Sequence, residues 1–443
     1  MELRDLIVTP LLLIVVYVGA YIIRPFVTDE INRIYFIPAL TVRILGAIAV
    51  GFIYQFYYDG GNTFNYHTHG SRHIWEAMWD SPDKGLRLLF NNGANHEGVY
   101  EYASKIRLFG DTRSYSIIRI AAFFDLITFS SYSATAVLFS LFSFLGAWLL
   151  FQTFYSQYPT LHKSIALACL FIPSVFFWGS GILKDTVTLS SLFILTYCSY
   201  RLFIRLKPSA LTIIGFLGSA YLIFAIKIYI ILAFLPALIL WVLMSHYSNV
   251  RPAILKLLLG PFVIVAIAVM AGWGVVKASE ENPQYSLEKI GETAKITAYD
   301  IRYYSGKDAG SGYTLGELDG SIGSLVRLAP QAVTVSLFRP YLWEVKNTFM
   351  FFSALEAAFF LGAVLFVAVR RGLFFWRGLS NANVLFTIVF SVAFAFAVGV
   401  STYNFGTLVR YKIPMLPFFA MSLILLNYYS KSERKLAALD STE

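Results

Sequence analysis

The chain has 443 residues, of which 57% are hydrophobic and only 14% are charged, and its mean hydropathy is +0.64. Soluble domains carry about 25% charged residues. This composition excludes an ordinary soluble protein and predicts an integral membrane protein whose helices pack in lipid. The formal net charge of +9 is spread over many short loops without a dense basic helix, so no nucleic-acid partner is expected.

Apolar runs close to the roughly 20 residues needed to cross a bilayer recur along the chain. They predict an all-α fold, a polytopic transmembrane helix bundle that occupies residues 1–443 as a single transmembrane domain. About eleven spans are expected from these runs. They lie near residues 6–23, 35–57, 131–154, 164–179, 186–204, 209–226, 228–246, 254–276, 348–369, 383–404 and 412–429.

The cationic loops predict an orientation for these spans. If the tail at residues 430–443 is cytoplasmic, the loops that fall on the same side hold most of the Lys and Arg residues of the short connections. This distribution satisfies the positive-inside rule. Two long segments, residues 58–130 and 277–347, are then expected on the outer side.

Each outer segment has its own predicted character. In the first, the stretch SRHIWEAMWD at residues 71–80 has apolar side chains near helical spacing, which predicts an amphipathic helix in the membrane interface. Residues 114–130 are apolar but include Arg119 and Asp125, so a horizontal or partly inserted helix is expected there. The second segment contains the Gly-rich stretch SGKDAGSGYTLGELDGSIGS, which is typical of a mobile loop and is interpreted as a lid.

Ionisable side chains begin directly where the second predicted span ends, in YYDGGNTFNYHTHGSRH at residues 57–73. The first of them, Asp59, is followed by Gly60 and Gly61. A carboxylate held at a membrane face in this way indicates chemistry rather than plain anchoring.

Three histidines in the same stretch, His67, His69 and His73, leave three interpretations open. His-x-His could begin a metal site, but no Cys and no closely repeated carboxylate completes a tetrahedral set. The alternatives are hydrogen bonds to a substrate or to Asp59, and a buried structural role. A divalent metal therefore stays open, and no other cofactor is predicted.

Lys184 and Asp185 lie in a very short connection between two apolar runs, within PSVFFWGSGILKD. They could pair with each other, or Asp185 could cap the following helix. The functional interpretation is that Lys184 binds a phosphate-bearing headgroup, with Gly179 and Gly181 allowing the backbone to approach closely.

Two further cationic segments are expected on the outer side. SLFRPYLWEVKN at residues 336–347 contains Arg339 and Glu344, and TLVRYKIPMLP at residues 407–417 contains Arg410. Interfacial anchoring and snorkelling would explain each of them singly. A planar guanidinium such as that of Arg339, however, suits bidentate contact with phosphate. Taken together, the separated acids and bases favour a site for an anionic, membrane-held ligand.

These motifs resemble those of the GT-C superfamily of polytopic glycosyltransferases. The resemblance rests on a span followed by an outer loop with an Asp and then Tyr-His (Asp59, Tyr66, His67), on the interfacial helix, on the PSVFFWGSGILKD turn and on the late RYKIPMLP motif. The bacterial mannosyl- and aminoarabinose-transferase-like envelope proteins are similar to this chain. One departure is an apparent extra helix before the span that delivers Asp59.

The resemblance implies transfer of a sugar from a polyprenyl-phosphate-linked donor to a glycan, lipid or protein acceptor at the outer, periplasmic face of a bacterial inner membrane. Asp59 would be the general base for the acceptor hydroxyl. Lys184, Arg339 and Arg410 would stabilise the charge on the leaving phosphate. The remaining predicted substrate-binding residues are Asp185, Glu344, Tyr66 and His67.

Two alternatives stay open from the sequence. An oligosaccharide repeat-unit polymerase acts on the same kind of lipid-linked glycan at the same face. A lipid-linked glycan transporter or a scaffold subunit belongs to a different class. Transporters more often show internal repeats and charges at the bilayer midplane, and the sequence shows neither pattern.

Overall fold

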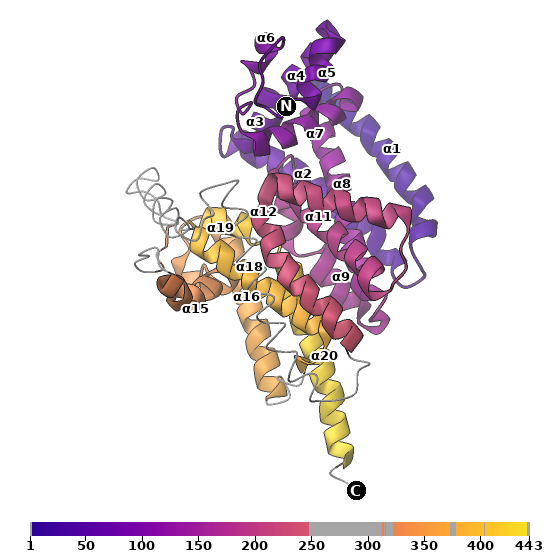
Figure 1. Ribbon diagram of the computed structural model, residues 1–443, viewed down its shortest axis with the longest axis vertical. Helices are drawn as coiled ribbons and strands as arrows, with labels where there is room; N and C mark the ends of the chain where they lie inside the picture. Colours follow the sequence, from indigo (N-terminus) through magenta and orange to yellow (C-terminus); the bar gives the residue numbers. More distant parts are fainter. Residues whose placement is uncertain are drawn as a thin grey trace. The chain divides into compact units, whose positions relative to one another are not determined.

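The computed structural model describes residues 2–247, 312–313, 315, 322–372, 378–402 and 404–440 (Figure 1). All regular secondary structure in these ranges is helical, apart from an isolated β-bridge between Gly312 and Asn404. The predicted all-α fold is therefore confirmed for the described part of the chain.

Seven described helices are long and apolar enough to cross a membrane, and they identify the chain as an integral membrane protein. They are α1 (Leu3–Val27), α2 (Arg33–Phe56), α8 (Tyr132–Tyr155), α11 (Lys184–Ser199) extended by the π-helical η3 (Tyr200–Ile204), α12 (Ala210–Tyr247), α16 (Thr348–Arg371) and α18 (Ala382–Ser401). A further candidate is the pair α19 (Phe405–Tyr411) and α20 (Leu416–Asp440), which is bent by 67°.

The expected number of about eleven spans stays a prediction. Residues 254–276 lie outside the described residues. The two runs at 209–226 and 228–246 form the single element α12, in which Lys227 has non-helical backbone angles, φ −145° and ψ 74°. The run at 412–429 belongs to the bent pair of α19 and α20.

The run at 164–179 is not one continuous helix. It forms α9 (His162–Leu170) and α10 (Pro173–Trp178), with an extended residue, Ile172, between them at φ −67° and ψ 121°. Pro173 explains the break. Its ring disfavours helical angles at the preceding residue and it has no N–H to continue the helix.

The chain divides into two compact units, which are described separately. Unit 1 comprises residues 1–202 and 207–227, and unit 2 comprises residues 203–206 and 228–443. In unit 1, α8 packs between α2 and α11. Ring contacts of Tyr35 with Phe151 and of Phe36 with Trp148 show that α2 runs antiparallel to α8.

Helices α8 and α11 pack closely and run in the same direction. A Cβ atom at Gly146 of α8 would lie 2.7 Å from the Cα atom of Ser190 of α11. Ten residues further along each helix, the hydroxyl of Ser156 bonds the hydroxyl of Tyr200 at 3.4 Å. Small side chains at such a contact let membrane helices approach closely, and this packing fixes the position of Lys184, which begins α11.

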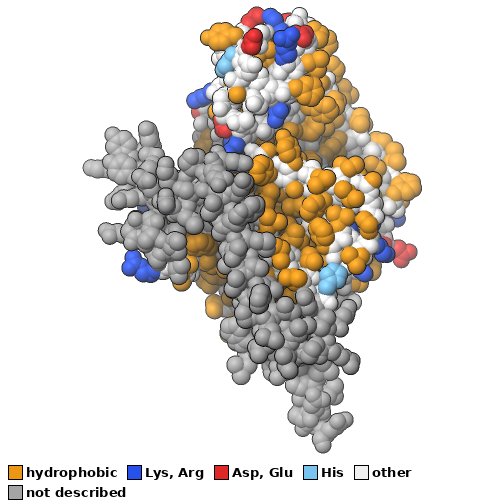
Figure 2. Space-filling view, in the orientation of Figure 1, with side chains coloured by type: hydrophobic (Ala, Val, Ile, Leu, Met, Phe, Trp, Pro, Cys, Tyr) orange, Lys and Arg blue, Asp and Glu red, His pale blue; other side chains and the backbone are white. Residues whose placement is uncertain are grey.

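The segment at residues 58–130 forms short helices at one end of unit 1. They are α3 (Asn62–Tyr66), the π-helix η1 (His67–Ser71), α4 (Arg72–Asp80), α5 (Pro82–Phe90), α6 (Tyr100–Ala103) and α7 (Thr112–Thr128), and the 3₁₀-helix η2 (Pro159–Leu161) follows α8. The predicted amphipathic helix is α4. Charged side chains gather over α4, α5 and α6, whereas hydrophobic side chains cover the neighbouring face (Figure 2).

Unit 2 is built from α15 (Ile322–Phe338), the 3₁₀-helix η5 (Leu342–Glu344), α16, α18, α19 and α20, together with the second half of α12. Helix α15 packs on α18 so tightly that a Cβ atom at Gly399 would collide with the carbonyl of Ala332. The stretch predicted as a lid lies mostly outside the described residues.

Candidate functional site

Lys184 begins α11 and reaches the start of α7. Its Nζ donates to Oδ2 of Asp111 at 3.2 Å, and the exposed fractions of the two side chains are 22% and 45%. An ammonium group has three donors. Among the described residues, the only acceptor that this ammonium group reaches is Asp111.

Asp185, the next residue, has a different partner. Lys227 Nζ donates to Asp185 Oδ1 at 2.5 Å, and the two side chains are 11% and 3% exposed. Lys227 is the residue at which α12 departs from helical geometry. The N-cap position of α11 is Leu183, without a side-chain cap, so Asp185 neutralises Lys227 rather than capping its own helix.

We call Asp111, Arg113, Lys184, Asp185 and Lys227 the Lys184 cluster. Lys184 interacts electrostatically with Asp111, Lys227 and Arg113. The members come from the first residues of α7 and α11 and from the kink of α12, so only folding brings them together. The cluster contains three cations and two carboxylates, and this excess of positive charge suits an anionic ligand.

Asp111 is the partly exposed anion of the Lys184 cluster. Burial by itself raises the pKa of Asp111, but hydrogen bonds from Ser114 and the charge of Lys184 outweigh that effect, and the net pKa lies below the ordinary 3.8. A carboxylate with a lowered pKa is a poor proton acceptor. Asp111 is therefore suited to orienting Lys184 rather than to acting as a base.

This lowered pKa has a consequence for stability. A depressed pKa in the folded state means that Asp111 stabilises the protein above its ordinary pKa of 3.8 and that the contribution is lost as pH falls through the folded-state value. We expect Asp111→Asn to lower the unfolding temperature slightly at pH 6, and the difference from wild type to shrink as pH falls below the ordinary pKa of 3.8. Thermal unfolding in detergent from about pH 2 to 7 measures this, and a pH-independent difference would contradict it.

The glycines of the α10–α11 connection have a packing role. A Cβ atom at Gly181 would lie 2.9 Å from Val50 Cγ1, and one at Gly179 would collide with Leu189 and with the carbonyl of Val175. The space beside both glycines is therefore occupied by protein atoms. Close approach of a ligand to this backbone, one of the interpretations from sequence, has no support in this geometry.

Asp59 lies in the turn after α2 and is exposed. Its φ is +50°, and Gly60 and Gly61 follow at +115° and +117°. Positive φ is rare outside glycine, although Asp and Asn tolerate it. Within the described residues no side chain pairs with the Asp59 carboxylate, so that carboxylate is accessible to an incoming group.

His67 and Tyr66 lie in the interior of unit 1. The Nε2 atom of His67 is 3.3 Å from Oδ1 of Asp125, and both side chains are almost completely buried. Asp125 also accepts hydrogen bonds from Ser71 and Thr135, both at 2.6 Å. This is the structural interpretation among those left open, because His67 contacts Asp125 and not Asp59.

The other two histidines of the stretch point elsewhere. The Nδ1 atom of His73 lies 3.0 Å from Oε2 of Glu76, and His69 is exposed. Within the described residues, no three His, Cys, Asp or Glu side chains are arranged to hold a metal ion.

In unit 2, Arg339 and Glu344 form a bidentate pair. Arg339 Nε donates to both carboxylate oxygens of Glu344 at 3.1 and 3.0 Å, and its Nη2 also donates to Oε1. Burial by itself raises the pKa of Glu344, but the hydrogen bonds from Arg339 lower it overall. The guanidinium also lies over the rings of Tyr313, Tyr341 and Phe405. A phosphate would have to displace Glu344 from the Nε–Nη2 edge of the guanidinium or bind through Nη1.

Arg410 lies near the end of α19 and is half-buried. Lys412, in the bend between α19 and α20, is completely buried and interacts electrostatically with Glu356 of α16. The charge of Glu356 inside a predicted span thus has a cation opposite it, which is the usual arrangement for ionisable residues in a membrane.

The predicted site residues therefore fall into separate groups. Lys184 and Asp185 join one cluster, Arg339 and Glu344 form a pair in unit 2, and Asp59 lies exposed in the turn after α2. Sequence reasoning missed Asp111 and Arg113, which lie at the polar start of α7 and carry no distinctive pattern. Lys227 carried a signal, because it is a lysine between two apolar runs.

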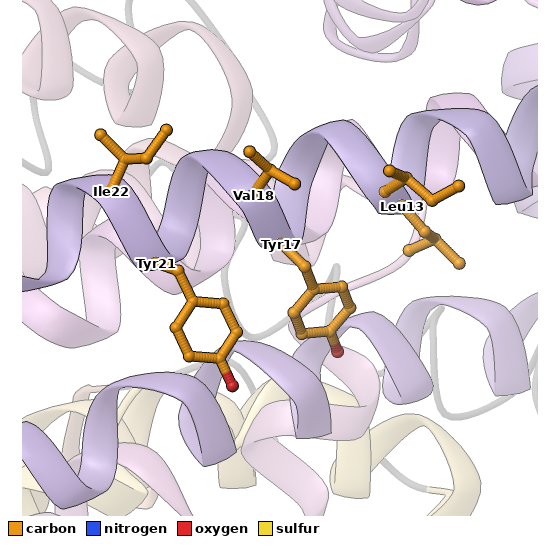
Figure 3. A pocket seen from close by; sticks show the side chains of 6 residues that line it. Leu13, Tyr17, Val18, Tyr21 and Ile22 are labelled. Carbon is orange, nitrogen blue, oxygen red and sulfur yellow. The ribbon is translucent and has the colours of Figure 1, made fainter.

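An open groove lies along α1, and its lining residues include no acid or cation (Figure 3). Its volume is about 690 Å³. Tyr17 and Tyr21 point to the same side of the helix, and Tyr17 bonds Thr41 of α2 at 2.9 Å. An open apolar groove of this kind suits hydrocarbon chains rather than chemistry. Its lining residues are Leu13, Ile14, Tyr17, Val18, Tyr21 and Ile22.

Comparison with models of protein families, with curated proteins and with solved structures finds no match to this chain. The class that the fold supports is a polytopic, all-helical membrane protein with a charged cluster in each of its two units.

Proposed function

We propose that the protein is a membrane glycosyltransferase that moves a sugar from a polyprenyl-phosphate-linked donor to a glycan, lipid or protein acceptor. The proposal places the reaction at the outer face of a bacterial inner membrane. Asp59 serves as general base, and the Lys184 cluster binds the phosphate of the donor.

The observation that supports this proposal most strongly is the composition of the Lys184 cluster. Lys184, Lys227 and Arg113 exceed the two carboxylates in charge, and Lys184 is partly exposed. Hydrogen bonds between an ammonium and a phosphate are charge-assisted and strong. Asp111 holds Lys184 in place in the absence of ligand, and a phosphate oxygen can bind the remaining donors of its ammonium group.

The proposed transfer step forms one bond and breaks one bond at the anomeric carbon of the donor sugar. The oxygen of the acceptor hydroxyl attacks the anomeric carbon of the donor sugar, and the bond from that carbon to the phosphate oxygen breaks. The leaving polyprenyl phosphate keeps the electron pair, and its growing charge is stabilised by Lys184. The hydroxyl proton passes to the carboxylate of Asp59, which is exposed and without a side-chain partner in the described residues.

In unit 2, Arg339, Glu344 and Arg410 stay sequence-based predictions of phosphate-binding residues. Asp185 holds the side chain of Lys227 in place within the cluster, because the two residues are ion-paired. Tyr66 and His67 are buried, so they support the loop that contains Asp59 from inside.

We expect Lys184→Gln to weaken binding of a polyprenyl-phosphate sugar by about 10- to 100-fold, because a hydrogen bond to a charged group contributes about 1.5–3 kcal/mol. Donor affinity of the purified, folded protein measures this. Lys84→Gln is the matched control, because Lys84 is another lysine paired with a carboxylate, that of Glu101 at 3.1 Å. The donor affinity of the Lys84→Gln variant should equal that of wild type.

Unchanged donor affinity in Lys184→Gln would sink the phosphate assignment. The products separate the alternative functions. A ladder of growing glycans would identify a repeat-unit polymerase, and movement of a lipid-linked glycan across proteoliposomes without any transferred sugar would identify a transporter.

A further inference from the structure

Arg43 is a completely buried cation inside a membrane-spanning helix. Its exposed fraction is 0%, and it lies in α2, ten residues after the first residue, Arg33. At 1.5 Å per residue, that is about 15 Å from the start of the helix and close to the middle of a span. Charged residues at this depth are rare and almost always have an opposite charge or a function.

The guanidinium of Arg43 is only partly satisfied. Its Nη1 donates to Oγ of Ser143 in α8 at 2.6 Å. The Ser143 hydroxyl donates to the carbonyl of Gly179 at 2.5 Å and lies 3.4 Å from the hydroxyl of Ser180. The Nε and Nη2 atoms of Arg43 are buried and have no hydrogen-bond partner in the part of the chain that the structure describes.

The positive charge of Arg43 is also unbalanced. No carboxylate of a described residue forms an ion pair with it, and the titratable group that interacts electrostatically with it is the thiol of Cys169 in α9. A guanidinium stays protonated in proteins. A buried charge without a counter-charge is strongly destabilising, and an anion beside the guanidinium would remove that cost.

We propose that Arg43 binds a small monovalent anion of the halide type inside unit 1, between α2, α8 and the α10–α11 connection. The anion accepts hydrogen bonds from Nε and Nη2 and balances the charge. A water molecule would satisfy the two donors but would leave the charge uncompensated.

The surroundings of Arg43 limit the size of this anion. One turn further along α2, a Cβ atom at Gly46 would lie 2.5 Å from the carbonyl oxygen of Phe176. The helix surface next to Arg43 thus packs directly against α10, which favours a small anion over phosphate, sulfate or a lipid headgroup. The bound anion joins α2 to the connection that leads to Lys184, and its role does not depend on the proposed transferase activity.

Thermal unfolding of the full-length protein in detergent tests this site. Purified protein is exchanged into sodium gluconate, and gluconate is replaced by chloride or bromide at constant ionic strength. A ligand that binds only the folded state raises the unfolding temperature as its concentration passes the dissociation constant. We expect a saturable rise of about 3 °C or more for wild type.

Arg43→Met and Arg43→Lys should abolish the halide-dependent rise. Arg24→Met is the matched control, because the Arg24 guanidinium lies at the end of α1 and donates to the carbonyl of Arg33, and it should keep the full rise. Cys169→Ser should keep it as well, since the anion and not a thiolate supplies the negative charge.

Anomalous scattering from bromide-soaked crystals of wild type provides a second measurement that needs no variant. We expect a bromide peak within hydrogen-bond distance of Arg43 Nε and Nη2. An unfolding temperature that is independent of halide, together with no bromide peak at Arg43, would overturn the proposal. A halide-dependent rise that is absent in wild type and present in Cys169→Ser would assign the counter-charge to the thiolate and would overturn it equally.

Discussion

Replacing Asp59 by asparagine is expected to reduce the rate of sugar transfer by about 10²- to 10⁴-fold while leaving donor affinity and thermal stability unchanged. The substitution removes the proton acceptor and keeps the size of the side chain. Asparagine also tolerates positive φ as aspartate does, so the backbone at φ +50° is preserved. Single-turnover transfer from a polyprenyl-phosphate sugar measures the chemical step.

Asp83→Asn is the matched control for this experiment. Asp83 is another exposed carboxylate of residues 58–130, 71% exposed and paired with Arg87 in α5 at 2.9 Å. Transfer by that variant should equal transfer by wild type. Full transfer by folded Asp59→Asn would show that another group accepts the proton, whereas loss of folding in this variant would point to a structural role for the turn.

Breaking the pair between Asp185 and Lys227 is expected to give the largest loss of stability. The two side chains are 3% and 11% exposed and their charged atoms are 2.5 Å apart. Asp185→Ala leaves the Lys227 ammonium buried without this partner. Removing one member of a buried pair typically costs about 3–5 kcal/mol, and urea or thermal unfolding of the purified protein measures the loss.

The double variant Asp185→Ala with Lys227→Met completes a mutant cycle. Since both charges are then absent, it should recover a large part of the stability lost in Asp185→Ala. Lys84→Met is the exposed control and should cost at most about 1 kcal/mol, because surface pairs contribute little. Additive losses in the double variant would show that the two residues do not stabilise each other.

Much of the helical framework was predictable, because its signal is local. The runs that predicted α1, α2, α8, α11, α16 and α18 are long and apolar, and the positions of these helices follow from composition alone. The helix break at Pro173 could also have been predicted from the sequence, since proline and the residue before it both disfavour helix. It was missed because hydropathy averaged over a window does not register a single residue.

The arrangement of charges was not predictable, because a charge in the sequence does not indicate its partner. Lys184 and Asp185 are adjacent and were expected to pair or to cap a helix, yet Lys184 bonds Asp111 and Asp185 bonds Lys227. Those partners lie 73 and 42 residues away along the chain. Arg43 carried a local signal, as a cation inside an apolar run, but only the packed helices show that no described carboxylate pairs with it.

The sequence by itself determined that this protein is an all-helical membrane protein and where most of its spans begin and end, because the lipid environment imposes apolar runs of a defined length. The tertiary structure alone decided which ionisable groups are paired, which are buried and which remain exposed. Ion pairing and burial depend on distances between segments that are remote in sequence, and helix packing sets those distances. Asp59 is exposed, Lys184 bonds Asp111, and Arg43 is buried with two donors that have no partner among the described residues.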